Sequence, residues 1–296
     1  MIRVWEANEA PITATAGGRE KGPSCPVVCA SCKRRPASKP VDTMNDSQGS
    51  LERNIAAFNA DAAALGGYAY TAIDRWSARH ATRRQTEKLV QILTQNFSPN
   101  VEVVDIGCGD GTFTLEIAER FQPAAICGID PAADAIAVAR SRIPRHLRGS
   151  VSFEVGDIYN LQAVARAGAI AVVRGVLHHL DRPRAAIAEL ARHFSFVIAL
   201  EPNGYNPAMK IIERASKYHR EHDEKSYWPP TLNRWFREEG FVPASQEFFC
   251  LVPYFCPTPV AKLLSLAERI VEAVPTMREI CGGTNLAYYH LRDLRD

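Results

Sequence analysis

The sequence predicts an α/β fold in which helices cover both faces of a mostly parallel β-sheet. Over residues 101–200, short apolar segments of strand length alternate with segments that have helical periodicity. This alternation is typical of parallel sheets with crossover helices. A glycine-rich turn at 107–111 directly follows the first apolar segment, and such sheets bind ligands beyond the carboxyl ends of their strands. The sequence therefore also predicts the edge at which a ligand binds.

The N-terminal segment, residues 1–43, differs in composition from the rest of the chain. It contains five prolines and shows neither helical nor strand periodicity. We therefore expect a disordered extension at 1–43, a helical cap at 44–100 and the main domain at 101–296. Met44 is a candidate natural start of the protein.

Three cysteines in this extension have the C-x3-C-x2-C spacing of an iron–sulfur motif: Cys25, Cys29 and Cys32. The next Cys or His along the chain is His80, so a fourth ligand is missing from the extension. We interpret the spacing as accidental, because short motifs predict sites loosely. No metal site is predicted.

The helical cap contains two predicted helices. An alanine-rich segment begins at Leu51 and ends at the pair Gly66-Gly67, and an amphipathic segment covers 82–97. Between them, residues 68–80 are aromatic and basic without clear periodicity. We expect this segment, with Tyr68 and Tyr70, to close over a ligand.

The main domain begins with five predicted strands. They share short runs of branched apolar residues and cover 101–107, 124–130, 151–157, 169–177 and 194–202. Helical segments at 112–121 and 132–143 separate the first three strands, which places the glycine turn at the first junction of strand and helix.

Composition excludes several classes of function. The 296 residues are 46% hydrophobic and 23% charged, as in ordinary soluble globular proteins. A formal net charge of +2 gives no basic face for nucleic acid. No segment approaches the roughly 18 apolar residues of a membrane span. Because the N-terminal residues also lack the apolar core of a secretory signal, we expect a cytoplasmic protein.

Three predicted strands deliver carboxylates to one edge of the sheet. Asp105 precedes the glycine turn, Asp130 ends the second strand, and Asp157 ends the third. An Asp at the end of a strand often only caps the next helix, but three of them beside a glycine turn favour a binding cleft. Asp130 lies where an acidic side chain accepts hydrogen bonds from ribose hydroxyls.

The turn does not have the pattern of a phosphate site. Thr112 stands where a dinucleotide fingerprint has glycine or alanine, and no lysine follows Gly111 as in a Walker loop. An acidic residue at the mouth of the turn repels a pyrophosphate but suits a ligand with an ammonium or sulfonium charge.

These motifs resemble those of the class I S-adenosylmethionine-dependent methyltransferases. "VVDIGCGDGTFT", "GID", "GDIYN" and "VLHHLDRPRAAIAELAR" are similar to successive family motifs. The resemblance implies a Rossmann-like, doubly wound, seven-stranded sheet that residues 243–252 and 284–292 complete as an antiparallel pair, with S-adenosyl-L-methionine as cofactor. It implies that Gly107, Gly109 and Gly111 pass the amino-acid part of the cofactor, that Asp130 holds the ribose, and that Asp157 and Ile158 border the adenine.

The acceptor site is predicted over the fourth and fifth strands and beneath an insertion at about 205–235. Methyl transfer from a sulfonium depends mainly on alignment of the acceptor and exclusion of water, and few catalytic residues are obligatory. The predicted pocket residues are polar or aromatic and lie near that edge: Tyr68, Tyr70, Arg174, His178, Glu201, Asn203, Tyr205, Tyr218, Tyr227 and Trp228.

Two histidines are candidate proton acceptors. His219 in the insertion is the first choice and His179 the second, because a histidine titrates near neutral pH. The alternative is that alignment alone drives the reaction and both histidines only shape the pocket.

Two classes of function remain open. The leading hypothesis is an enzyme that methylates a small molecule. The alternatives are a methyltransferase directed at a protein or RNA, and a cofactor-binding protein without catalysis. Residues 261–275 form an amphipathic segment that serves a core, a lid or a contact in a homo-oligomer.

Overall fold

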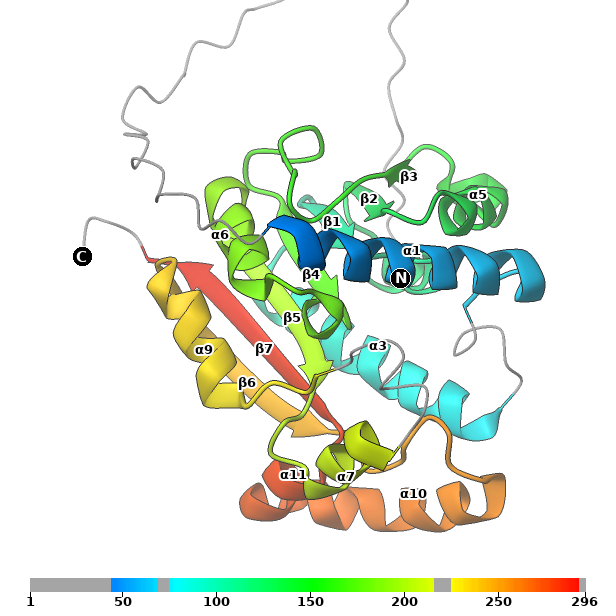
Figure 1. Ribbon diagram of the computed structural model, residues 1–296, viewed down its shortest axis with the longest axis vertical. Coiled ribbons are helices and arrows are strands. Elements are labelled where there is room, and N and C mark those ends of the chain that lie inside the picture. Colours follow the sequence, from blue (N-terminus) through cyan, green and yellow to red (C-terminus); the bar gives the residue numbers. More distant parts are fainter. Residues whose placement is uncertain (1–43, 69–74, 216–224, 293–296) are drawn as a thin grey trace, which may run out of the picture. The chain divides into compact units, whose positions relative to one another are not determined.

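The computed structural model describes residues 44–68, 75–215 and 225–292. Within these ranges the chain forms a seven-stranded sheet with strand order β3-β2-β1-β4-β5-β7-β6 (Figure 1). The strands are β1 (Glu102–Ile106), β2 (Ala125–Asp130), β3 (Val151–Val155), β4 (Ile170–Arg174), β5 (Phe196–Pro202), β6 (Phe241–Phe249) and β7 (Thr284–Leu291). β1 to β5 pair in parallel, and β7 pairs antiparallel with both β5 and β6. This confirms the predicted fold class.

Helices cover both faces of the sheet. The helices are α1 (Met44–Leu65), α3 (Trp76–Asn96), α4 (Thr112–Phe121), α5 (Ala133–Ser141), α6 (Pro183–His193), α7 (Pro207–Ala215), α9 (Pro229–Glu238), α10 (Thr258–Ala273) and α11 (Pro275–Cys281), with short 3₁₀ turns η1 (Arg145–Leu147) and η2 (Leu177–His179). α3, α4 and α5 pack on one face and α6 and α9 on the other.

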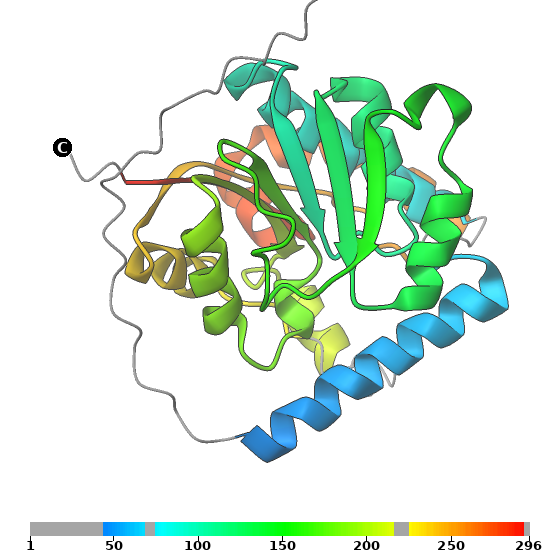
Figure 2. The same ribbon diagram turned by 90° about the horizontal axis from the view of Figure 1, so that it is seen from above.

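Alternation along each strand divides its side chains between these two layers. On β4, Val172 packs with α3 and α4, whereas Val173 packs with α6 and α9. All apolar positions of β4 are buried, because a central parallel strand is covered on both sides. Figure 2 shows α1 lying across the carboxyl ends of β1 and β2, outside both layers.

The second helix of the cap is longer than predicted. α3 begins at Trp76, so residues 76–80 belong to a helix and not to an irregular segment. Trp76 stacks on His80 with ring centroids 4.8 Å apart, and the His80 Nε2 lies 2.7 Å from Glu268 of α10. The aromatic and basic residues of this first turn thus face another helix and not the sheet, which hides the periodicity in the sequence.

Several predictions fall on residues that the structure does not describe. The extension at 1–43, Tyr70, Tyr218 and His219 lie outside the described ranges. In the described part of the chain, no helix has both the length and the apolar character that a membrane crossing demands.

Candidate active site

The glycine turn between β1 and α4 is shaped by contacts that allow only glycine. Gly107 has φ of +77°, and a Cβ atom there meets Val176 Cγ2 at 2.2 Å. Gly109 has φ of +56°, and its Cβ meets the Tyr68 ring at 2.4 Å. The amide groups of Gly107 and Cys108 donate to the Ile129 carbonyl at 2.8 and 3.0 Å. The turn is therefore held to β2 by its backbone.

Cys108 points from this turn into the core. Its side chain is buried within the cluster that contains Phe153 and Ile126. Burial, together with the nearby carboxylates Asp105 and Asp130, raises the pKa of the Cys108 thiol well above its usual value. The thiol is therefore protonated at neutral pH.

Asp130 ends β2 directly beside the turn. Its Oδ2 accepts from the Gly109 amide at 2.9 Å, and its Oδ1 accepts from the Ala132 amide at 2.9 Å. Burial raises the pKa of Asp130, and these hydrogen bonds oppose that rise. The hydroxyl of Tyr68 donates to Oδ1 over a long 3.4 Å. Asp130 is therefore a carboxylate preorganised by backbone donors, with capacity for further donors because a carboxylate has about four lone-pair sites.

Tyr68, predicted for the acceptor pocket over the fourth and fifth strands, lies over the glycine turn beside Gly109 and Asp130. Its ring packs on Phe58 of α1, with centroids 4.9 Å apart, and its amide donates to Asp110 Oδ2 at 3.1 Å. Asp110 also pairs with Arg142 Nη1 at 3.0 Å. Asp110 and Arg142 are not among the site residues predicted from the sequence, although Asp110 stands inside the glycine motif. The Asp110 carboxylate, paired with Arg142, therefore binds Tyr68 of the segment after α1 to the glycine turn.

Asp105 is enclosed and does not open onto the turn. It is buried beneath α4, where Thr114 Oγ1 donates to its Oδ2 at 2.6 Å. Burial raises the pKa of Asp105 to about 6, while Thr114 and Arg174 act in the opposite direction. This carboxyl group is thus poised to titrate below neutral pH.

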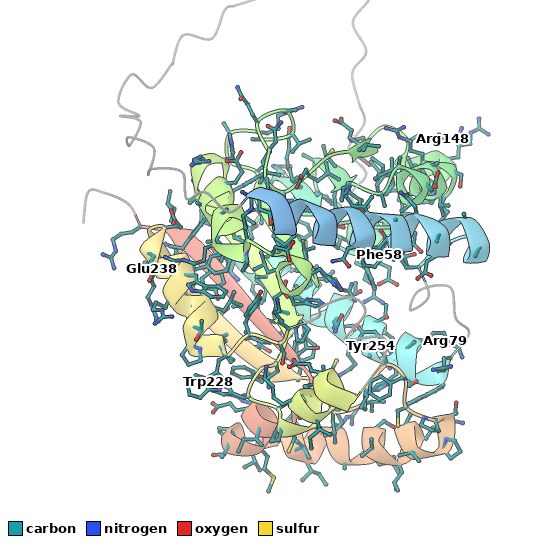
Figure 3. The ribbon with its side chains drawn as sticks, viewed as in Figure 1. Phe58, Arg79, Arg148, Trp228, Glu238 and Tyr254 are labelled. Carbon is teal, nitrogen blue, oxygen red and sulfur yellow. The ribbon has the colours of Figure 1, made fainter. Side chains whose placement is uncertain are left out.

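Arg174 ends β4 and is held from two sides. Its guanidinium carbon lies 3.0 Å from the centroid of the Phe113 ring, and its Nε and Nη2 donate to Gln85 Oε1 at 3.1 and 2.7 Å. The hydroxyl of Tyr254 donates to the same oxygen at 2.7 Å (Figure 3). Arg174 Nη1 is buried without a hydrogen-bond partner among the described residues. No sequence signal identifies Gln85 and Tyr254 as partners, because they are distant in the chain.

Glu201 fixes the turn that follows β4. It is buried, and it accepts from the amides of Val176, Leu177 and His178 at 3.1, 2.9 and 3.2 Å. His178 Nδ1 lies 2.8 Å from Glu201 Oε2, which assigns the Nδ1 proton to this bond. His179 packs beside it, with ring centroids 4.0 Å apart, and edge-on against Phe58 of α1.

Asn203 connects β5 to α11 and does not face a pocket. It has no exposed surface, and its Nδ2 donates to the carbonyls of Glu279 and Gly282 at 2.7 and 2.8 Å. Asn206 Nδ2 likewise donates to the carbonyls of Cys281 and Gly282. These two amides seat α11 beyond the end of β5.

The aromatic residues of the insertion form two separate groups. Tyr205 packs on Trp228 and Phe248, with centroids 5.7 Å away in each case. Tyr227 instead packs on Trp235 of α9, at 5.0 Å. Trp228 is 58% exposed, so the first group presents an aromatic surface after β5, and the second belongs to the layer of α6 and α9.

The segment after β3 is arranged as a tight turn. Asp157 Oδ1 accepts from the Tyr159 amide at 3.0 Å, and Ile158 is buried against the layer of α6. The residues described in the structure include no group of three or more His, Cys, Asp or Glu side chains suited to a metal ion.

Comparisons with known proteins agree on the family. A family model for a methyltransferase domain matches residues 103–195. Malonyl-[acyl-carrier protein] O-methyltransferase of Halalkalibacterium halodurans is 29% identical over 132 residues, which is 42% of this chain and 46% of that protein. Trans-aconitate 2-methyltransferase of Deinococcus radiodurans is 37% identical over 84 residues, 28% of this chain and 29% of that protein. The chain thus spans less than half the length of these relatives.

A solved structure extends the likeness to the whole fold. Magnesium protoporphyrin IX methyltransferase from Synechocystis PCC 6803 with bound SAM superimposes with a TM-score of 0.57 at 12% identity, covering 86% of this chain and all of that one. At 12% identity this likeness shows the fold of the chain alone.

Proposed function

The chain belongs to the class I S-adenosylmethionine-dependent methyltransferases, and on that premise we propose that it methylates a small-molecule acceptor. The observation that carries the methyltransferase part of this proposal is the buried Asp130 carboxylate, preorganised by backbone donors beside a turn that only glycine can form. As a member of this family the chain uses S-adenosyl-L-methionine as cofactor.

The residues at this edge fit that cofactor. Asp130 already accepts three hydrogen bonds, so it has a free acceptor site for one ribose hydroxyl, and for a second where the ligand replaces the long bond from Tyr68. The buried Nη1 of Arg174 has no partner among the described residues, and an unpaired buried charged donor is costly. An anionic group satisfies it, so Arg174 would hold the carboxylate of the methionine part. Asp157 and Ile158 would border the adenine.

The cofactor supplies a methyl group on a positive sulfur, which is already activated for displacement. The chain then has to align the acceptor in line and exclude water. Phe58, Tyr68 and His179 form a contiguous aromatic cover beside the turn, which suits a positively charged ligand. His219 and His179 stay the proposed proton acceptors, for acceptors that must lose a proton.

Calorimetry with S-adenosylhomocysteine tests the cofactor site. Asp130→Ala should weaken binding about 10- to 100-fold, which corresponds to the roughly 1.5–3 kcal/mol of a charge-assisted hydrogen bond. Asp134→Ala is the matched control, because Asp134 is exposed four residues further on. Equal affinity of the Asp130 variant and the control contradicts the ribose assignment.

Incubation with methyl-labelled cofactor and fractionated extract tests the class of acceptor. Label in the low-mass fraction supports a small molecule, and label in protein or RNA supports the alternative of a macromolecular substrate. The exposed Trp228, packed on the half-buried Tyr205, supports a small, partly apolar acceptor. The modest net charge of +2 supports a protein that acts without nucleic acid. We also propose that the protein is cytoplasmic.

A further inference from the structure

Helix α10 turns its carboxylates toward the protein. Glu268 is 3% exposed, and its oxygens contact the Leu251 amide at 2.9 Å and His80 Nε2 at 2.7 Å. Glu272 accepts from the Cys250 amide at 3.2 Å and pairs with Arg84 of α3. The face of α10 that packs on the protein is therefore its acidic face.

The opposite face of α10 is apolar and exposed. Leu263, Leu266 and Ile270 have spacings of three and four residues, and they are 68%, 76% and 70% exposed. Such spacing places them on one stripe of the helix. Four further residues continue this surface on α10, its C-terminal end and α11: Val260, Val274, Met277 and Ile280, which are 41% to 50% exposed. We call these seven residues the apolar ridge.

A ridge of this kind indicates an interaction surface. Single exposed leucines are ordinary, but monomeric soluble proteins rarely expose contiguous apolar patches. Figure 1 shows α10 and α11 together with α7 at one end of the molecule, beyond the end of β5. The ridge is firmly seated there, because Asn203 binds α11 and Arg84 binds α10.

The charges of α10 favour an anionic partner. Its exposed charged residues are Lys262 and Arg269, which lie seven positions apart and so flank the ridge on one side. α11 adds the half-buried Arg278 and the exposed Glu279, whose charges cancel. Two copies packed through α10 would bring these cations together without an exposed carboxylate of α10 between them. An apolar stripe with flanking cations instead matches an interfacial helix, which buries its leucines at the boundary of headgroups and acyl chains.

We propose that the apolar ridge docks the protein on the surface of a lipid bilayer that contains anionic lipids. The ridge residues enter the interface, and Lys262 and Arg269 contact the headgroups. In this docked state the protein lies on the membrane surface without crossing the bilayer. Docking is also independent of the proposed methyl transfer, because no ridge residue belongs to the cofactor edge.

Co-sedimentation of the full chain with vesicles tests this proposal. Vesicles of phosphatidylcholine with about one quarter phosphatidylglycerol should bind the protein, and vesicles of phosphatidylcholine alone should bind it at least tenfold more weakly. Leu266→Asp and Ile270→Asp should each lower the bound fraction about tenfold or more, and Lys262→Glu combined with Arg269→Glu should remove the preference for anionic vesicles. Val155→Asp is the matched control, because Val155 is 55% exposed far from the ridge.

Two further measurements complete the test. Thermal unfolding should be unchanged in the Leu266 variant, since its side chain is exposed, and affinity for S-adenosylhomocysteine should be unchanged as well. Absence of vesicle binding by the unaltered chain overturns the proposal. A dimer in analytical ultracentrifugation that Leu266→Asp dissociates, with equal vesicle binding by both forms, assigns the ridge to a second copy and also overturns it.

Discussion

The glycine turn and the segment after β5 lie at the same sheet edge but are held in different ways. Main-chain amides of the turn donate to the adjacent strand β2, as in the bonds from Gly107 and Cys108 to the Ile129 carbonyl. Side-chain amides hold the segment after β5 to residues more than seventy positions away, as in the bond from Asn203 to the Glu279 carbonyl. The glycine turn therefore depends on its own motif and the adjacent strand, whereas the segment after β5 depends on contacts between parts of the chain that are far apart in sequence. Four predictions test this contrast.

Gly107→Ala should have the largest effect, because the added Cβ meets Val176 at 2.2 Å in a backbone of positive φ. Backbone strain and overpacking together should lower the free energy of unfolding by about 3 kcal/mol, as measured by urea denaturation. Gly168→Ala, with φ of +80° and an open surrounding, should cost only about 1 kcal/mol. Equal losses in the two variants would mean that the contact with Val176 contributes nothing.

Asn203→Ala should lower the free energy of unfolding by about 2 kcal/mol, because it removes the side-chain donor to the carbonyls of Glu279 and Gly282, the second of which is a buried bond. If the two regions are independent, the affinity for S-adenosylhomocysteine stays within twofold of the unaltered chain. Denaturation and calorimetry on the same variant measure both quantities. A tenfold loss of affinity would break the proposed separation of the two regions.

Asp105 should give a dependence of stability on pH. Its pKa is raised to about 6 in the folded protein, so the folded state binds more protons than the unfolded state between about pH 4 and 6. The stability that Asp105 contributes is complete below its unfolded pKa and is lost as pH rises through 6. Between pH 5 and 7 the unaltered chain should therefore lose about 1 kcal/mol relative to Asp105→Asn. Parallel pH profiles of the two proteins would contradict the raised pKa.

Tyr68→Phe should have the smallest effect, about 0.5 kcal/mol in the free energy of unfolding, because the bond to Asp130 is long at 3.4 Å. The ring and its packing on Phe58 remain. Tyr68→Ala removes both and serves as the contrasting variant, with a loss of roughly 3 kcal/mol. Chemical denaturation of the pair separates the hydroxyl from the ring.

The same contrast explains how much the sequence predicts. The five strands within 101–202 and the glycine turn follow from local patterns, since each is specified by contiguous residues, whereas the closing antiparallel pair follows from the resemblance to the family. The partners of Arg174 do not, because Gln85 and Tyr254 come from remote segments. Periodicity indicates that 261–275 is amphipathic, but it does not indicate which face points inward. That orientation depends on Arg84 and His80, which satisfy the carboxylates of α10 from another helix.

The buried thiol of Cys108 bears on whether the protein would methylate its own side chains. A thiolate is the strongest nucleophile among the side chains of this turn, and Cys108 lies within the same five residues as the glycines proposed to pass the sulfonium donor. Burial and the neighbouring carboxylates raise the pKa of this thiol, so it carries a proton and is a far weaker nucleophile than the thiolate. Its side chain points to the core, away from the edge. The fold thus keeps this sulfur atom, which lies beside the proposed site of an alkylating cofactor, in the protonation state that competes least with the acceptor.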